Sequence, residues 1–427
     1  MRKNYIGGVL FVFITFFSAN VMAQEKGKEI FFYKKAEQNT GILFSGSKNR
    51  EEFITDKSRR FEELTTGLTQ FYYNRQYWNY LDFKQEKFQI NTGLGPIIGN
   101  GNWLDSSRVE VIDANHRILG VRANASIAYT SRYYWDRNNY TIIDVNAWGK
   151  YDLLNVKSDG TRIDSMAASF PYHEEEKAKK LRYGFQAKAG WGIGRLNPMN
   201  NYMIADYLLN KYYKGRNFSE AELIQVADEI GRIKADRAVT KEHDIHEETK
   251  QIENFIRKKL FLELPENLQN EWQYGEFLPR FNGRRVEAGP FFEYFNREPD
   301  FVYGAYVKVE NVKYKSHTWN RNFCANLSYN GYKRKDWILA EFDLGWSYYP
   351  NLKSQWDFGI NYKPGLVVNG LDDIGTLKHA LIPYVAWFTQ MTSKTRLQLD
   401  ASLRIADDDQ FVLAGPEFSV KLFRSNY

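Results

Sequence analysis

Residues 181–195 read LRYGFQAKAGWGIGR, and this stretch decides the fold. Successive side chains of an extended strand point to opposite faces, so alternation predicts a β-strand with one apolar and one polar face. A strand that crosses a bilayer needs about 9–11 residues, whereas most strands of soluble proteins have about 5–6. The length therefore favours a membrane strand. The apolar positions are Leu181, Tyr183, Phe185, Ala187, Ala189, Trp191 and Ile193.

Comparable alternation recurs along most of the chain. In a bilayer every backbone polar group needs a partner, so strands that span it must close into a barrel. Thirteen such segments can be counted, and single-chain bacterial barrels have even strand numbers. The sequence therefore predicts an all-β membrane barrel of about 12–14 antiparallel strands. The segments lie at 64–74, 77–98, 118–134, 140–156, 181–195, 285–297, 301–315, 318–332, 336–349, 354–368, 377–391, 394–407 and 410–425.

The apolar spacing changes to about 3.6 residues within 197–278, which predicts an α-helical insert subdomain. Ser219 and Glu222 form a capping box that starts one of its helices. The apolar stripes are sufficient for a small bundle with its own core. The insert divides the barrel into a first part, 61–196, and a second part, 279–427.

The N-terminus has the organisation of a secretory signal peptide over residues 1–23. Arg2 and Lys3 precede an apolar segment, and Val21-Met22-Ala23 supplies small residues for cleavage near Ala23. Residues 24–60 are irregular and highly charged, which predicts a flexible N-terminal arm. A strand near Ile30–Tyr33, or one within the charged arm, would complete an even strand count; the other alternative is that one of the thirteen segments is not a strand.

Composition limits the possible classes of protein. Cleavage removes two basic residues and no acidic one, so the formal charge falls from +6 to +4, which does not favour nucleic acid as a partner. One cysteine, Cys324, excludes an internal disulfide. Aromatic residues make up 16% of the chain, yet the mean hydropathy is −0.57. A membrane barrel combines these values because lipid-facing apolar positions alternate with a polar lumen.

The pattern resembles outer-membrane β-barrel proteins of Bacteroidota over residues 61–427, with aromatic-rich strands and a C-terminal aromatic, Tyr427. The most specific part is Trp191-Gly192-Ile193-Gly194-Arg195-Leu196, which leads directly into helices that contain Arg232 and Arg237. This arrangement is similar to a group of uncharacterised barrel proteins with a helical insertion. The resemblance implies a fold and an outer-membrane location but no activity.

Counting strands back from the C-terminus gives an orientation. If the C-terminus is periplasmic, the insert lies in the periplasm. The two long connectors, Gly99–Arg117 and Lys157–Lys180, then lie outside the cell, where long loops of such barrels are usually found.

The polar faces of the strands are expected to line the lumen. Two interpretations stay open: the charges bias a channel toward anions, or they form ion pairs across strands and close the lumen. The candidate lumen-lining residues are Arg122, Arg132, Arg182, Lys188, Arg396 and Arg404.

No motif in the sequence fixes a catalytic residue, a cofactor or a metal, and none is expected. His243, His246 and Glu247 share a helical face, and two imidazoles with a carboxylate could bind zinc. The order is not H-E-x-x-H and no third ligand is evident, so a solvated charged face is the simpler interpretation.

The sequence favours a non-enzymatic outer-membrane barrel of a Gram-negative bacterium, acting as a narrow channel or as a scaffold for periplasmic partners. Expected partners are outer-membrane lipid, the barrel assembly machinery and a periplasmic protein bound through the insert. Two alternatives remain: an outer-membrane enzyme with a site at the barrel rim, and a secreted soluble β-rich protein.

Overall fold

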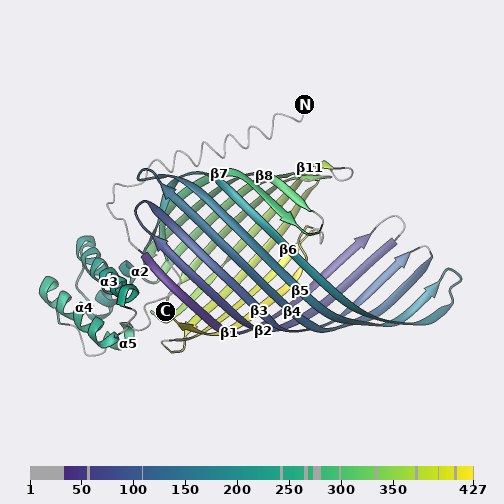
Figure 1. The fold of residues 1–427 in the computed structure, drawn as a ribbon, viewed down its shortest axis with the longest axis horizontal. Helices are drawn as coiled ribbons and strands as arrows, with labels where there is room; N and C mark the ends of the chain where they lie inside the picture. The colour runs from purple at the N-terminus through teal and green to yellow at the C-terminus, as the bar shows by residue number, and fades with distance from the viewer. Residues whose placement is uncertain are drawn as a thin grey trace.

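The computed structural model describes residues 33–426, apart from 55–57, 108, 241–243, 264–267, 273–279, 298–299, 332–334, 371–373, 393 and 408–410. The described strands form one closed antiparallel barrel in which β14 pairs with β1 (Figure 1). The predicted barrel is confirmed, with fourteen strands. The first strands are β1 (Tyr33–Ile54), β2 (Ser58–Tyr80), β3 (Lys84–Ser107), β4 (Glu110–Tyr134), β5 (Asn139–Asp164), β6 (Ser169–Pro198) and β7 (Phe281–Phe295). The others are β8 (Phe301–Ser316), β9 (Trp319–Gly331), β10 (Lys335–Tyr348), β11 (Ser354–Gly370), β12 (Leu377–Gln390), β13 (Thr395–Ala406) and β14 (Gly415–Asn426).

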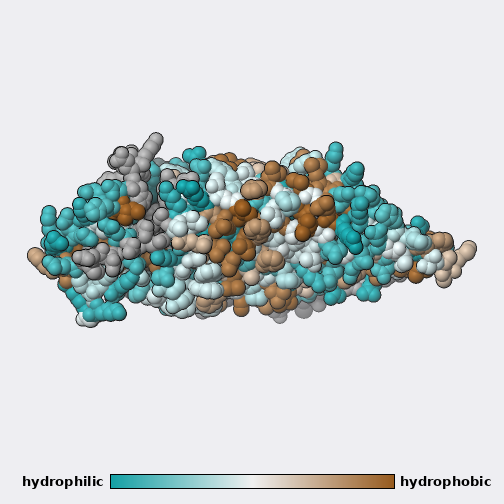
Figure 2. Space-filling model, turned by 90° about the horizontal axis from the view of Figure 1, so that it is seen from below, coloured by the Kyte–Doolittle hydropathy of each residue, from teal (hydrophilic) through white to brown (hydrophobic). Residues whose placement is uncertain are grey.

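The two faces of the wall differ in polarity. Large apolar side chains point outward, and Phe71, Ile98 and Trp191 are each at least half exposed. The residues between them point inward and are mostly polar, as Gln70 and Asn74 are. Figure 2 shows the outward apolar residues as a brown band across the middle of the molecule, with hydrophilic surface at both ends. Such an apolar belt is the surface that a barrel presents to lipid.

The prediction of a flexible arm at 24–60 is wrong for the part that the structure describes, 33–54 and 58–60. Tyr33–Ile54 forms β1, which pairs with β2 along its length and with β14 from Gln38 to Ser47. The charged arm therefore holds the fourteenth strand, which was one of the options for an even count. Its charges obscured the strand because Lys48, Arg50 and Glu51 follow Phe44, the last outward apolar side chain that the structure describes on β1, and both faces of a strand can meet water past the belt.

The start of β1, the end of β14 and the insert all lie at one end of the barrel, which we call the insert end (left in Figure 1). This agrees with the predicted placement of the insert on the side of the C-terminus. At the opposite, far end, Gly99–Arg117 and Lys157–Lys180 were expected to be loops, but they are mostly strand. We call these two hairpin extensions the wing; they lack apolar alternation because they protrude beyond the belt.

The wing has one unpaired side. β6 pairs with β5 from Ser169 onward, but its pairing with β7 begins only at Gly184. Within the described residues, no strand therefore lies beside the outer part of β6 on the β7 side. Asn296 ends this edge, because its side chain accepts from the Tyr183 amide at 2.8 Å and donates to the Leu181 carbonyl at 2.9 Å.

The predicted helical insert is present between β6 and β7. It contains α2 (Asn200–Tyr212), α3 (Glu220–Thr240), α4 (Ile245–Leu260) and α5 (Leu268–Trp272). The capping box forms as expected, since the Ser219 hydroxyl accepts from the Glu222 amide and the Glu222 carboxylate accepts from the Ser219 amide. None of the described helices is long and apolar enough to cross a membrane.

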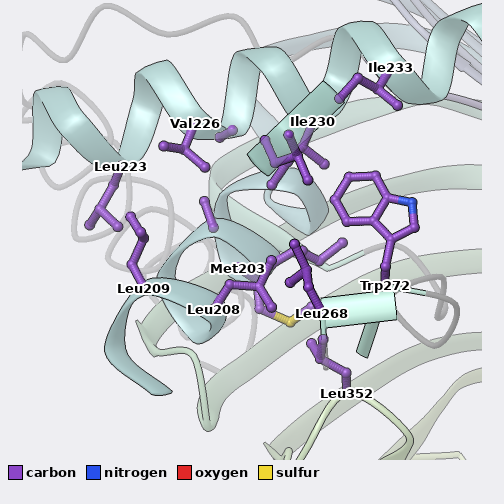
Figure 3. Packing of buried hydrophobic residues seen from close by; sticks show 14 of the residues in the cluster. Met203, Leu208, Leu209, Leu223, Val226, Ile230, Ile233, Leu268, Trp272 and Leu352 are labelled. Carbon is purple, nitrogen blue, oxygen red and sulfur yellow. The ribbon is translucent and has the colours of Figure 1, made fainter. Parts of the chain in front are cut away.

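The helices share one apolar core (Figure 3). Side chains of α2, α3 and α5 meet there, and Leu352 reaches the core from the turn between β10 and β11. Two inward residues of the barrel, Phe388 on β12 and Phe423 on β14, belong to the same buried cluster. The insert is therefore packed on the barrel through shared apolar contacts.

The insert leaves and rejoins the wall at neighbouring positions. Pro198 at the end of β6 is in register with Phe281 at the start of β7, and the Met199 amide donates to the Arg280 carbonyl at 2.7 Å. Gly194 precedes this exit with φ +95°, and a Cβ there would lie 2.3 Å from the carbonyl oxygen of Arg284. Only glycine fits both the backbone angle and the close approach.

Candidate functional site

All six predicted lumen-lining residues stand on the inward face, since their neighbours in sequence point outward with exposed apolar side chains, as Val121, Tyr133 and Leu403 do. Their surroundings differ greatly. Some are buried in ion pairs near the insert end, and others are open to solvent farther along the wall.

Arg132 belongs to a buried ionic network near the insert end. Its Nε donates to Glu287 Oε2 at 3.1 Å, and the Tyr140 hydroxyl donates to the same oxygen at 3.2 Å. Arg132 is 9% exposed and Glu287 is 4% exposed. A second pair, Arg285 with Glu310, lies on the adjoining strands β7 and β8. Arg132 therefore acts as a structural cation here, which fits the interpretation of a lumen closed by ion pairs.

Arg396 is buried in the same way at the seam of the barrel. Its guanidinium pairs with Glu37, which also holds Lys35 Nζ at 2.9 Å. Arg396 is on β13 and Glu37 is on β1, so the ion pair reaches across β14. Ser425 Oγ donates to Asn39 Oδ1 beside it. These contacts fasten the first strand to the last.

Inward side chains at the insert end are shielded from solvent on strands all round the barrel. The buried set includes polar and charged groups as well as aromatic rings, so the shielding is not confined to apolar residues. The set contains Glu37, Trp78, Gln85, Arg132, Tyr140, Arg195, Glu287, Asn320, Ser347, Gln355, Gln390, Arg396 and Ser425.

The middle of the inner wall is different, because solvent reaches its charges. Lys363 pairs with Glu341 at 2.9 Å, and their side chains are 36% and 40% exposed. Lys421 pairs with Asp400 at 3.4 Å, and both are about one-third exposed. Lys188 is half-buried, with Nζ 5.5 Å from the centre of the Tyr306 ring. The lumen is thus polar and wet in its middle and shielded at the insert end.

The remaining three candidates lie toward the far end. Arg122 Nε donates to Asp152 Oδ1 at 2.7 Å, and Asp152 is 2% exposed. Arg404 donates to Asn49 Oδ1 at 2.6 Å, which links β13 to β1. Arg182 is exposed on the inner face of β6, in register with Lys150 on β5.

The insert is fastened to the barrel by Asp206 of α2. Tyr314 on β8 donates its hydroxyl hydrogen to Asp206 Oδ2 at 2.7 Å, and His317 Nδ1 lies 3.5 Å from the same oxygen. Burial raises the pKa of the Asp206 carboxyl, but the hydrogen bonds from His317 and Tyr314 outweigh it and hold this pKa below its ordinary value. The carboxylate form is therefore favoured at the contact.

The zinc hypothesis gains no support from the described part of the insert. His243 lies outside the described residues, and His246 Nδ1 is 2.6 Å from the Gln269 side-chain nitrogen. No group of three His, Cys, Asp or Glu side chains suited to a metal occurs among the residues that the structure describes.

Sequence reasoning missed the acidic partners of the buried arginines. Glu37 was assigned to the arm, and Glu287 was not singled out although it lies on the inward face. The alternation marks an inward carboxylate, but its partner is several strands away. Only the closed register of the barrel brings Glu287 to Arg132.

No family model matches the chain, and no curated protein matches it. Several solved structures are similar at low identity. The translocator domain of the autotransporter NalP from Neisseria meningitidis has 7% identity and a TM-score of 0.32, covering 98% of both chains. An outer membrane channel from Pseudomonas putida F1 has 9% identity and a TM-score of 0.35, covering 94% of this chain and all of the other. The transport unit of the autotransporter AIDA-I from Escherichia coli has 9% identity and a TM-score of 0.34, covering 97% of each chain.

Proposed function

We propose that this protein is a non-enzymatic channel of the outer membrane of a Gram-negative bacterium, which admits small polar solutes into a lumen that the insert closes at one end. One observation carries the proposal: charged side chains that are about one-third exposed or more line the middle of the inner wall, inside a barrel whose outer surface is an apolar belt. A wet, polar interior within a lipid-facing wall is the arrangement that channels use.

The closure at the insert end rests on burial and contacts. Inward side chains there are shielded on strands all round the barrel, and Phe388 and Phe423 share the core of the insert. Asp206 adds polar contacts with Tyr314 and His317. The wall beneath the insert is continuous through the pairing of Pro198 with Phe281, so the barrel does not depend on the insert for closure.

The orientation in the membrane is part of the proposal. Turns at the insert end are short, whereas the strands at the far end extend into the wing. Bacterial barrels keep short turns on the periplasmic side and longer segments outside the cell. We therefore place the insert in the periplasm, with outer-membrane lipid and the barrel assembly machinery as expected partners.

Planar-bilayer recording tests the channel and its closure together. The purified full chain is compared with a variant in which a short Gly-Ser linker replaces residues 201–279. The variant keeps Asn200 and Arg280, because Asn200 Oδ1 accepts from the Arg280 amide at 2.8 Å. The full chain should open rarely, and the deletion variant should conduct steadily. A folded deletion variant without conductance would refute the channel.

A matched control keeps the insert and changes only its exposed surface. The double substitution Lys258→Gln and Lys259→Gln removes two exposed charges of α4. Its conductance should equal that of the full chain. Heat-modifiable gel migration of every variant reports that the barrel has folded.

A scaffold role is the second candidate, and one surface of the insert favours it. Phe261, which follows α4 in the left-handed conformation, is 87% exposed. Arg257, Lys258 and Lys259 are exposed beside it. An exposed aromatic ring among cations suits a periplasmic partner with an acidic surface. Photo-crosslinking from position 261 in cells, with position 254 on the same helix as control, should capture such a partner; equal yields at both positions would refute this role.

A further inference from the structure

We propose an oxyanion-binding site on the inner wall of β4, β5 and β6, made by Lys150, Lys180 and Arg182. This deepens the proposed channel and rests on it, because it names the group that the solute carries: a phosphate or a carboxylate. We call Arg122, Lys150, Lys180 and Arg182 the cationic patch. It lies at the far end of the barrel wall, where Lys180 ends the wing and the outward neighbours Val121, Tyr151 and Leu181 are exposed apolar side chains at the edge of the belt.

The register of the sheet brings these residues together. Lys150 on β5 stands opposite Arg182 on β6, and Asp152 on β5 stands opposite Lys180 on β6 and Arg122 on β4. Residues opposite each other across strands have Cβ atoms about 5 Å apart, and same-face neighbours along a strand are about 7 Å apart. Four cations therefore surround one carboxylate within a small area of wall.

That one carboxylate is already committed. Arg122 holds Asp152 with two hydrogen bonds, Nε to Oδ1 at 2.7 Å and Nη2 to Oδ2 at 3.3 Å. Lys150 Nζ is 3.8 Å from Oδ2, at the limit of an ion pair. Asp152 is 2% exposed and so has little surface left for a further partner. Lys180 and Arg182 form no ion pair with any residue that the structure describes.

The arrangement is unfavourable without a ligand. Like charges directly opposite each other on a sheet destabilise it, and Lys150 with Arg182 is such a pair. Arg182 is exposed and the Lys150 side chain is 29% exposed, so a solute in the lumen can reach both. A planar guanidinium and two ammonium groups match the oxygens of phosphate or carboxylate, which would relieve the repulsion.

Binding is tested with inorganic phosphate and, in a separate arm, with succinate. Line broadening of the phosphorus-31 resonance reports phosphate binding to the folded barrel in detergent, and calorimetry reports both ligands. The triple variant K150Q/K180Q/R182Q should raise the dissociation constant by about tenfold or more, since one lost charge-assisted hydrogen bond is worth that ratio. Binding of both ligands would show that the site recognises the oxyanion that phosphate and carboxylate have in common. Binding of only one ligand would show which of the two groups the solute carries.

The chain offers a matched control on the same strand. Lys177 and Lys179 alternate with Lys180 and point to the outer face of β6, so K177Q/K179Q removes similar charges from the wrong side of the wall. This variant should bind phosphate as the full chain does. An equal loss in both variants, or no loss in either, would overturn the site. If the triple variant does not fold, the single variants K180Q and R182Q carry the same comparison.

Ion selectivity separates this site from the channel itself. The insert-deletion barrel should prefer chloride to potassium, and the triple variant should lose that preference, while K177Q/K179Q keeps it. Phosphate binding without any conductance would support the site and refute the channel. Conductance that neither phosphate nor the triple variant alters would keep the channel and refute the site.

Discussion

Removing Glu287 should destabilise the barrel more than removing its partner Arg132. Glu287→Leu leaves Arg132, 9% exposed, without its carboxylate and leaves the Tyr140 hydroxyl without its acceptor. Breaking a buried ion pair from one side costs about 3–5 kcal/mol. Both groups are almost fully buried, so solvent screening does not reduce this figure.

Charge counting explains the asymmetry. The network holds three cations, Arg132, Arg285 and Lys308, and two carboxylates, Glu287 and Glu310. Loss of Arg132 leaves two cations with two carboxylates, and Glu287 still accepts the hydrogen bond from the Tyr140 hydroxyl. Arg132→Leu should therefore lower the free energy of unfolding by only about 1–3 kcal/mol. The double variant exchanges the pair for apolar groups and should recover most of the loss.

Urea unfolding of the barrel in phospholipid vesicles, followed by tryptophan fluorescence and by gel migration, measures the three variants. Glu287→Leu should be the least stable of the three variants. Arg132→Leu and the double variant should each be less destabilised than Glu287→Leu. An Arg132→Leu variant less stable than Glu287→Leu, or a double variant that simply adds the two losses, would refute the network argument.

Three further predictions follow from single positions. Gly194→Ala meets both a positive φ and a carbonyl oxygen 2.3 Å from the new Cβ, whereas Gly215→Ala meets a φ of +97° with no atom close to the new Cβ. Urea unfolding should show that Gly215→Ala lowers the free energy of unfolding by about 1–2 kcal/mol and that Gly194→Ala lowers it by clearly more. Equal losses would contradict the close approach at Gly194. Phe71→Lys places a charge in the apolar belt and should lower the free energy of unfolding in vesicles by about 2–4 kcal/mol, while Phe170→Lys in the wing should leave it almost unchanged. Similar losses for the two variants would mean that Phe71 does not face lipid. Because the pKa of Asp206 is lowered, its contribution to docking of the insert is complete above the unfolded-state pKa near 4 and is lost as the pH falls through the lower folded-state pKa. Amide hydrogen exchange in α2 should therefore be faster at pH 3 than at pH 6. An equal acceleration in Asp206→Asn would show that another group is responsible.

Alternation made the barrel wall predictable. Wherever one face meets lipid and the other meets water, as at residues 181–195, the period of two appears directly in the sequence. The same reasoning put Arg122, Arg132, Arg182, Lys188, Arg396 and Arg404 on the inner face. It also located the helical insert, because the apolar period changes there.

What alternation cannot supply is contact between distant strands. Arg132 and Arg182 have the same pattern in sequence, yet one is buried against Glu287 and the other is exposed beside Lys150. β1 and the wing were not predicted as strands for a related reason. Past the apolar belt both faces of a strand can be polar, so the sequence there shows no alternation of apolar and polar residues. Closure and register decide these features, and neither is a local property.

The free side of β6 in the wing has a consequence for association between molecules. Residues Ser169 to Lys180, which precede the contacts with Asn296, leave a row of backbone donors and acceptors that another chain could pair with, as exposed sheet edges do in aggregation. The edge carries Glu174, Glu175 and Glu176 followed by Lys177, so an identical strand would meet like charges in several registers. Charge along the edge thus disfavours strand pairing between neighbouring copies, while a partner with the complementary order of charges would still fit.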